Sequence, residues 1–249
     1  MKLSTLDSRT AELTPTPLST QIVGNRVHVY ETVDSTNARA LAVGGDGTVV
    51  LADQQSAGRG RHGRTWHSAP GLGLWFSVVF EQPVPGLAFA GPLAVRDALR
   101  SDCLLKLKWP NDLLLNGRKV CGILVEHRRK RSVVGVGLNV RHRSEDFPEN
   151  LRGKAISLEV GLQRPFDRGD LIRRILTELD KRVMLLREGH LEAFRREWAS
   201  ACAIRGCRVR AGSIVGVVRE IDDEGGLLVE SAGATHRILF GDIIELSEE

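Results

Sequence analysis

The sequence predicts an α+β protein: a main domain built on a central mixed, mostly antiparallel sheet with helices on one face, then a small C-terminal SH3-like β-barrel. Apolar runs bounded by glycine and proline indicate strands over much of the first 140 residues. A long helical pattern occupies Phe166–Arg187. From Ile204 onward, roughly five short apolar runs alternate with glycine turns, as in small barrels. We expect a loosely ordered leader over residues 1–24, the main domain over 25–202 and the β domain over 203–249.

The first elements alternate between strand and helix. Arg26–Glu31 alternates apolar and polar residues, which predicts a strand. Asp34–Asn37 precedes an alanine- and leucine-rich run, and Asp or Ser at an N-cap is a helix-start signal. These polar residues either only cap the helix or also face a ligand, because a helix N-terminus attracts anions. Two strands and a helix are expected next: Thr48–Ala52, Leu74–Phe80 and Leu87–Arg100.

Short strands joined by tight turns then predict an antiparallel meander. Asn116-Gly117 is a strong hairpin signal within it. The expected strands are Leu104–Lys108 continuing into Leu113–Leu115, then Lys119–Glu126 and Val133–Val140. Residues 141–153 read as a polar loop, and a helix over Leu191–Ala199 follows the long one.

Composition excludes several classes of protein. The chain has 249 residues, 42% hydrophobic and 27% charged, as ordinary globular domains have. A net charge of +4 and a pI of about 9.1 are too weak alone to indicate nucleic-acid binding. Four cysteines without CxxC spacing, and no secretory signal, predict reduced thiols in a cytoplasmic protein. No apolar window approaches about 18 residues, so membrane insertion is not expected.

The most informative stretch is Gln54–Trp66, where three arginines and three glycines alternate before a tryptophan. Glycine allows close approach of the backbone to a ligand, and the arginine fork matches carboxylates and phosphates. A flexible, cationic loop on a rigid scaffold is expected. The spacing of Gly58, Gly60 and Gly63 matches the dinucleotide fingerprint, but Pro70 and the glycines after it forbid the helix that this fingerprint needs.

A second constellation is Lys108-Trp109-Pro110-Asn111-Asp112, in which a cation, an amide and a carboxylate surround a proline that fixes the turn. Asn111 or Asp112 could coordinate Mg²⁺, and Lys108 could meet a phosphate oxygen. A β-bulge with exposed polar residues is the structural alternative. Gly122 would let a group lie flat against the sheet, and Gly135–Asn139 places two glycines and an asparagine on one face.

These motifs resemble, in kind and order, those of the biotin protein ligases, a family with a class II synthetase-like fold. Each is modest alone, but five in order over residues 34–139 are very specific, and the helices and C-terminal β domain also fit. The motifs are Asp34-Ser35-Thr36-Asn37, Gln55-Ser56-Ala57-Gly58-Arg59-Gly60-Arg61-x-Gly63-Arg64-x-Trp66, Lys108-Trp109-Pro110-Asn111-Asp112, Gly117-Arg118-Lys119-x-x-Gly122-Ile123-Leu124-Val125-Glu126 and Gly135-x-Gly137-x-Asn139.

The resemblance implies an ATP-dependent ligase. Biotin's carboxylate would attack the α-phosphorus of ATP, giving biotinyl-5′-AMP and pyrophosphate, and a lysine of the biotin carboxyl carrier protein of acetyl-CoA carboxylase would then become biotinylated. ATP and biotin are the implied substrates and Mg²⁺ the implied cofactor. Two anions must meet, so clustered Arg and Lys with Mg²⁺ would offset their repulsion. Such a reaction requires no enzyme nucleophile, and the sequence shows none.

The resemblance also assigns roles to residues. Those implied to contact biotin are Ser35, Thr36, Asn37, Gln55, Arg59, Gly60, Arg61 and Lys119. Those implied to serve ATP are Arg61, Arg64, Lys108, Asn111 and Asn139, with Trp66 near the adenine. Close backbone approach adds Gly58 and Gly122 to the binding set, and Asp112 would bind magnesium, act as base for the incoming lysine, or only orient Lys108. The expected catalytic set is Arg59, Arg61, Lys108, Asp112 and Lys119.

Several expectations concern alternatives and partners. A lipoate- or octanoate-handling ligase or transferase of the same fold is the first rival, and an RNA-binding module is the second. About two dozen residues precede the first strand, fewer than the roughly 50 a DNA-binding domain needs, so DNA binding is not expected. A homodimer through the edge of the central sheet is left open. The loop over residues 54–66 is expected to be open or disordered without ligand and to fold over biotinyl-AMP.

Overall fold

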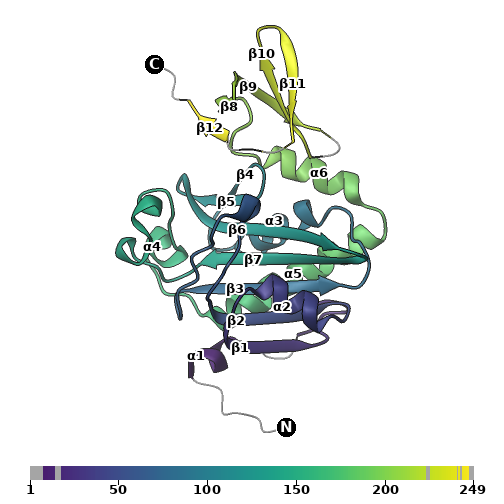
Figure 1. Ribbon diagram of the computed structural model, residues 1–249, viewed down its shortest axis with the longest axis vertical. Coiled ribbons are helices and arrows are strands. Elements are labelled where there is room, and N and C mark those ends of the chain that lie inside the picture. Colours follow the sequence, from purple (N-terminus) through teal and green to yellow (C-terminus); the bar gives the residue numbers. More distant parts are fainter. Residues whose placement is uncertain (1–7, 15–17, 223–224, 240, 242, 247–249) are drawn as a thin grey trace.

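The computed structural model describes residues 8–14, 18–222, 225–239, 241 and 243–246, which form a larger domain and a smaller C-terminal unit (Figure 1). The larger domain contains a seven-stranded sheet with the order β1-β2-β3-β7-β6-β5-β4. Strands β1 and β2 are parallel, and the other five neighbouring pairs are antiparallel. The predicted α+β class and the mixed, mostly antiparallel sheet are confirmed.

The strands lie close to the predicted runs. Those of the larger sheet are β1 (Val27–Val33), β2 (Thr48–Gln55), β3 (Gly73–Phe80), β4 (Lys106–Lys108), β5 (Asp112–Leu115), β6 (Arg118–Arg128) and β7 (Arg131–Asn139). The helices are α1 (Ser8–Glu12), α2 (Thr36–Val43), α3 (Leu87–Ala98), α4 (Leu158–Leu162), α5 (Arg168–Arg187) and α6 (Leu191–Ser200). The predicted meander corresponds to the antiparallel run from β4 to β7.

The two faces of the large sheet differ in what covers them. Helices α3 and α5 pack on one face, where alternate side chains of β3 such as Phe76 and Val78 join the main hydrophobic core. The other face carries α2, which buries Ala40 against Val50 and Val79 in a small separate cluster. The expectation of helices on one face therefore describes α3 and α5, whereas α2 lies on the opposite face, beside the predicted site.

The leader differs from its expected loose order where the structure describes it. Residues 8–12 form the helix α1, and Leu13 and Val23 are fully buried in the main core. The buried carboxylate of Asp180 in α5 accepts the backbone N–H groups of Ile22 and Val23, each at 2.8 Å. Such long-range contacts leave no periodic pattern in the sequence, which is why pattern reading misses this order. Residues 1–7 and 15–17 lie outside the described residues.

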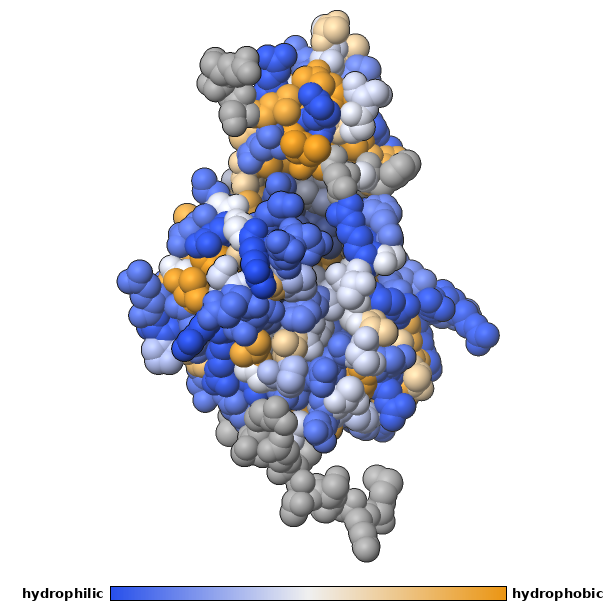
Figure 2. Space-filling model, turned by 60° about the vertical axis from the view of Figure 1, so that its left-hand side comes forward, coloured by the Kyte–Doolittle hydropathy of each residue, from blue (hydrophilic) through white to orange (hydrophobic). Residues whose placement is uncertain are grey.

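The C-terminal unit is a five-stranded antiparallel sheet with the order β11-β10-β9-β8-β12, as expected in strand number. Its strands are β8 (Arg208–Ala211), β9 (Ile214–Ile221), β10 (Leu227–Ser231), β11 (Ala234–Ile238) and β12 (Ile243–Glu245). The unit exposes Leu239 and Ile244, and Figure 2 shows apolar side chains gathered on it above a mostly hydrophilic main domain. Within the described ranges, every helix is too short or too polar to cross a bilayer.

Candidate functional site

The predicted site residues gather on the face of the sheet that carries α2. Strand β7 presents Gly135, Gly137 and Asn139 to this face, because the alternate residues Val134, Val136 and Leu138 enter the core on the other side. Gly137 pairs with Gly122 of β6 and with Trp75 of β3. Because glycine has no side chain, the middle of the sheet leaves space on this face, which side chains from other segments fill.

One such group is a polar cluster at the N-terminus of α2. Ser35 is the N-cap, and its hydroxyl accepts the backbone N–H of Ala38 at 3.5 Å. Thr36 donates both its backbone N–H (2.8 Å) and its hydroxyl (3.1 Å) to the amide oxygen of Gln55 at the end of β2. The Gln55 amide N–H in turn donates to the Ser68 hydroxyl at 2.8 Å. The cap residues thus do more than close a helix: they join the first motif to the loop motif.

The cluster extends across the sheet through Asn37 and Ser77. The Ser77 hydroxyl on β3 lies 2.8 Å from the Thr36 hydroxyl and 2.6 Å from the Asn37 amide oxygen. The Asn37 amide donates to Glu126 of β6 at 2.8 Å, and Arg59 of the loop lies 3.7 Å from the same carboxylate. Asn37 also fills the space over Gly135, where a Cβ atom would come within 2.2 Å of its amide oxygen.

The loop over residues 54–66, called the Arg/Gly loop from here on, has a defined fold in the structure. Its stems run antiparallel, with the backbone N–H of Trp66 donating to Gly58 at 2.8 Å and that of Gly60 donating to Arg64 at 2.7 Å. A 3-10 turn over Arg61–Gly63 forms its tip. No α-helix follows within residues 54–72, all of which are described, so the dinucleotide fingerprint is excluded as predicted. The structure shows the loop folded against the sheet, and its opening in the free protein stays a prediction.

Trp66 lies over the paired glycines of the central strands. A Cβ atom on Gly137 would come within 2.4 Å of the Trp66 ring, and one on Gly122 within 2.7 Å. The ring meets Trp75 edge-on at a centroid distance of 6.3 Å, and the Lys119 ammonium lies 5.0 Å above its centre. The sequence predicted that these glycines allow a flat group to approach. In the structure that group is Trp66 itself.

Charge concentrates beside this tryptophan. Lys119 at the start of β6 forms an ion pair with Asp112 of β5, with Nζ 2.7 Å from Oδ1. Arg61 lies near enough for Asp112 and Arg64 to influence it, although burial is the main cause that lowers the pKa of its guanidinium. Lys108 is the cross-strand partner of Asp112 in β4. Asp112 therefore sits among several cations and is paired with Lys119, not with Lys108 as the sequence suggested.

This arrangement does not fit a protein-held metal at Asp112. The carboxylate is already neutralised by Lys119, and no group of three His, Cys, Asp or Glu side chains suited to a metal occurs among the described residues. Mg²⁺ sites usually combine one or two carboxylates with substrate phosphates. Asp112 offers one carboxylate that could join substrate phosphates in such a site, and its magnesium role stays a prediction.

Two predicted ATP residues hold backbone in place. The Asn111 amide donates to the carbonyl oxygen of Ile123 at 2.6 Å, and the Asn139 amide donates to that of Ile156 at 3.2 Å. Asn139 thereby fixes the segment that follows β7 against the sheet. Pattern reading missed Ser68, Ser77 and Glu126 as members of the site. Ser77 lies inside an apolar strand, and only its polarity at a buried position could have marked it.

Comparison with known proteins agrees with this geometry. The model of the biotin/lipoate A/B protein ligase family matches residues 29–141. The biotin--[acetyl-CoA-carboxylase] ligase of Mycobacterium tuberculosis is 35% identical over 92% of this chain and 94% of its own length. The bifunctional ligase/repressor BirA of Bacillus spizizenii is 34% identical over 91% of this chain and 76% of its own. The chain covers all of a biotin protein ligase structure from Aquifex aeolicus in complex with biotin and ATP, with 90% of this chain aligned, a TM-score of 0.79 and 29% identity.

The fold and the site together define an acyl-activating protein ligase, with a sheet face lined by small residues and a cationic loop above it. The chain belongs to the biotin/lipoate A/B protein ligase family. Two of the relatives that align with at least 90% of this chain, those from Mycobacterium tuberculosis and Aquifex aeolicus, are biotin ligases.

Proposed function

We propose that this protein activates biotin as biotinyl-5′-AMP and transfers the biotinyl group to a lysine of the biotin carboxyl carrier protein of acetyl-CoA carboxylase. Its family membership and its similarity to biotin--[acetyl-CoA-carboxylase] ligases support the reaction class. The observation that carries the choice of biotin over lipoate is the polar cluster of Thr36, Gln55, Ser77 and Asn37.

Hydrogen counting shows why this cluster suits a urea-type ligand. The amide oxygens of Gln55 and Asn37 face each other through the hydroxyls of Thr36 and Ser77, which makes three oxygen–oxygen contacts. Both amides are oriented by other bonds, so two hydroxyl hydrogens must serve all three contacts. A ligand N–H would relieve the deficit, and a freed hydroxyl could donate to a ligand carbonyl. The ureido ring of biotin has both groups, whereas the dithiolane of lipoate has neither.

The charges support the joining of two anions. Five cationic side chains, Arg59, Arg61, Arg64, Lys108 and Lys119, come from the loop and the β4–β6 strands, against the carboxylates of Asp112 and Glu126. An excess of cations lowers the repulsion between the biotin carboxylate and the triphosphate. It also stabilises the charge that develops on the phosphoryl oxygens and on the leaving pyrophosphate.

In the proposed first step, a carboxylate oxygen of biotin forms a bond to the α-phosphorus of ATP. The bond between the α-phosphorus and the oxygen that bridges it to the β-phosphorus breaks, and pyrophosphate leaves with the bonding electrons. Lys119 is suited to hold the carboxylate, because Asp112 fixes its ammonium beside Trp66. In the second step the neutral amine of the carrier lysine attacks the acyl carbon, AMP leaves with the bonding electrons, and the amine proton is released. Asp112 acts in this scheme by orienting Lys119.

The loop would shield the reactive anhydride from water. Its stems place Arg59 and Trp66 over the sheet, and we propose that the loop opens for substrate exchange and closes for chemistry. Limited proteolysis with trypsin tests this, since the loop contains three arginines. Cleavage within residues 54–66 should slow when biotin and ATP are added together. Unchanged cleavage would contradict the gating.

Self-association through the sheet would use β1. The two outer strands of the sheet are β1 and β4, and β4 is already joined by the segment around Cys202, whose backbone flanks Leu107. An edge strand offers unpaired backbone groups to a second copy. Light scattering with and without biotin and ATP would detect a dimer. A cytoplasmic location, which four free cysteines favour, is part of the same proposal.

The decisive test of the activity is ATP–pyrophosphate exchange. We expect exchange that depends on biotin and is not supported by lipoate or octanoate. RNA should neither stimulate nor inhibit it, since the second rival function is an RNA-binding module. Transfer is then followed as an avidin-induced shift of a carrier domain. Exchange that depends on lipoate instead would replace this proposal with the first rival.

A further inference from the structure

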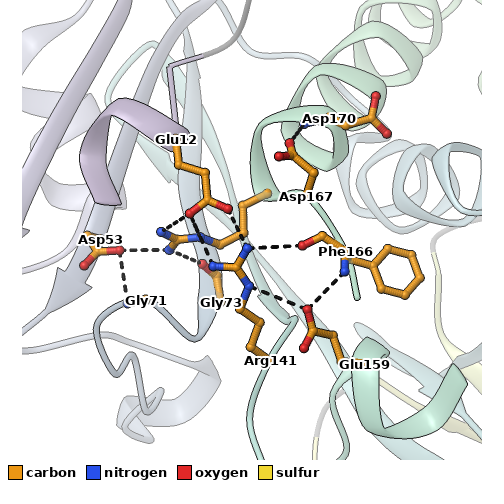
Figure 3. Close-up of polar contacts among 10 residues, drawn as sticks. Glu12, Asp53, Gly71, Gly73, Arg141, Glu159, Phe166, Asp167 and Asp170 are labelled. Atoms are coloured by element: carbon orange, nitrogen blue, oxygen red, sulfur yellow. Dashed lines mark hydrogen bonds and ion pairs between the residues drawn. The ribbon is translucent and has the colours of Figure 1, made fainter. Parts of the chain in front are cut away.

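A fully buried arginine lies beneath the Arg/Gly loop. Arg168 opens α5, and its side chain is 0% exposed. Its guanidinium donates to Asp53 at 2.8 Å and to the carbonyl oxygen of Gly73 at 3.3 Å (Figure 3). An arginine stays charged in a protein interior, so these contacts offset a large desolvation cost. The position of Arg168 is therefore fixed by its partners.

Those partners mark the two ends of the loop. Asp53 is the last residue before Gln54, and its carboxylate also accepts the backbone N–H of Gly71 at 3.1 Å. Gly73 is the first residue of β3. One buried ion pair thus joins the chain entering the loop to the chain leaving it. The loop residues of the proposed site, among them Gln55, Arg59, Arg61, Arg64 and Trp66, all lie between these ends.

A second layer of charges comes from the N-terminal segment. Glu12 at the end of α1 accepts from Arg168 at 3.1 and 3.3 Å and from Arg141 at 2.5 Å. Burial raises the pKa of the Glu12 carboxyl, but the two arginines together lower this pKa by more than burial raises it. The net shift of the pKa is therefore downward. Arg141 also donates to the carbonyl oxygen of Phe166 at 3.2 Å and forms an ion pair with Glu159 at 3.6 Å. Figure 3 shows the Arg141 guanidinium beside the Glu12 carboxylate.

We propose that Arg168 and Glu12 are positioning residues for the ligase reaction. Arg168 joins the two ends of the segment over residues 54–72, which contains the Arg/Gly loop, and Glu12 holds Arg168 in place. The N-terminal helix α1 then supports the substrate site although it contributes none of the proposed substrate-contacting residues. This inference rests on the proposed function only for its kinetic consequence, because the state of the loop can be measured without substrates.

The test compares trypsin cleavage at two places in one native protein. The loop offers Arg59, Arg61 and Arg64, and the exposed hairpin between β6 and β7 offers Arg128 and Arg129 as an internal reference. In Glu12→Gln, cleavage in the loop relative to the hairpin should rise roughly tenfold, which corresponds to about 1.4 kcal/mol of local opening. The hairpin corrects for differences in trypsin activity between preparations, and the control variant described next separates general loosening of the protein from opening of the loop base.

Glu159→Gln is the matched control, because it removes a carboxylate from the same network without touching Arg168. The ratio of loop cleavage to hairpin cleavage in Glu159→Gln should equal that of the wild type. The same ratio should be higher in Asp53→Asn than in Glu12→Gln. In biotin-dependent exchange, Glu12→Gln should raise the KM for biotin more than it lowers kcat. A ratio unchanged in Glu12→Gln and Asp53→Asn, or raised equally in Glu159→Gln, would overturn the inference. Failure of biotin activation alone would overturn the proposed function and leave the cleavage result standing.

Discussion

Lys119 and Asp112 form an ion pair across neighbouring strands, with the ammonium nitrogen 2.7 Å from a carboxylate oxygen. Lys119 is the second residue of β6 and Asp112 is the first of β5, so the pair is held by two backbone segments of one antiparallel ladder. The ammonium also lies 5.0 Å above the Trp66 ring. Asp112 therefore sets where Lys119 points. An orienting role of Asp112 can be distinguished by experiment from a role as the base for the incoming lysine.

Asp112→Asn should reduce biotin-dependent pyrophosphate exchange roughly 10- to 100-fold, because Lys119 loses the partner that orients it. The substitution keeps the shape of the side chain and removes its charge. Transfer from preformed biotinyl-AMP to the carrier should fall much less. The opposite result, normal exchange with lost transfer, would assign Asp112 to the second step as a base. Both steps can be followed on one preparation.

Ser77→Ala should raise the KM for biotin. Removal of the hydroxyl leaves Thr36 and Asn37 facing a buried methyl group, which costs about 1–3 kcal/mol, or roughly 5- to 150-fold. The KM for ATP should change little. Ser132→Ala is the matched control, since Ser132 is equally buried at the far end of β7 and contacts Val84 and His127 instead. Equal biotin KM values in the two variants would refute the hydroxyl argument.

Gly137→Ala should displace Trp66. The added methyl group would lie 2.4 Å from the indole, closer than non-bonded carbon atoms pack, so either the ring or the strand must move. We expect tryptophan fluorescence to shift and exchange activity to fall at least tenfold. Gly60→Ala provides the steric comparison, because its nearest contact is 3.5 Å and the melting temperature should be nearly unchanged. A Gly137→Ala protein with native fluorescence would contradict the assigned packing.

Stability should fall in mildly acidic solution because of His142. Burial, followed by the proximity of His67, lowers the pKa of His142 from 6.5 to about 4. The unfolded chain then takes up a proton below about pH 6.5 that the folded protein refuses until about pH 4. Stability is therefore complete above pH 6.5 and falls toward pH 4, by about 3 kcal/mol at most. Below pH 4 this contribution stays constant.

Denaturant unfolding at pH 7, 5.5 and 4 measures that dependence. His142→Phe should flatten the curve between pH 6.5 and 4, because the aromatic stack with Phe147 persists while the titrating group is gone. His190→Gln, at an exposed histidine, should leave the curve unchanged. An equally steep curve in His142→Phe would assign the acid sensitivity to other groups.

The sequence anticipated the strands, the main helices and the motif positions because each depends on local periodicity or on turn chemistry. Gly58-to-Trp66 and Lys108-to-Asp112 were recognisable since their residue types are unsuited to a core. The partner of Asp112 was not predictable, because Lys108 is nearer in sequence and is also its cross-strand neighbour, whereas the ion pair forms with the side chain of Lys119 from the adjacent strand β6.

Other features were beyond local pattern for the same reason. Ser77 looks like an ordinary residue of an apolar strand until α2 places Thr36 and Asn37 above it. The order of the N-terminal segment depends on Arg168 and Asp180, more than 150 residues away in sequence. The sequence also did not indicate which side chain covers Gly122 and Gly137, because Trp66 reaches these glycines only through the fold of the loop.

The closed base of the loop has a consequence for protein engineering. Asp53 and Gly73 meet through a single buried guanidinium, so everything between them behaves as an insert with fixed ends. A segment of different length or composition could be grafted between residues 56 and 70 without changing β2 or β3. Libraries that recode only residues 56–70 would then explore new acyl substrates on an unchanged scaffold.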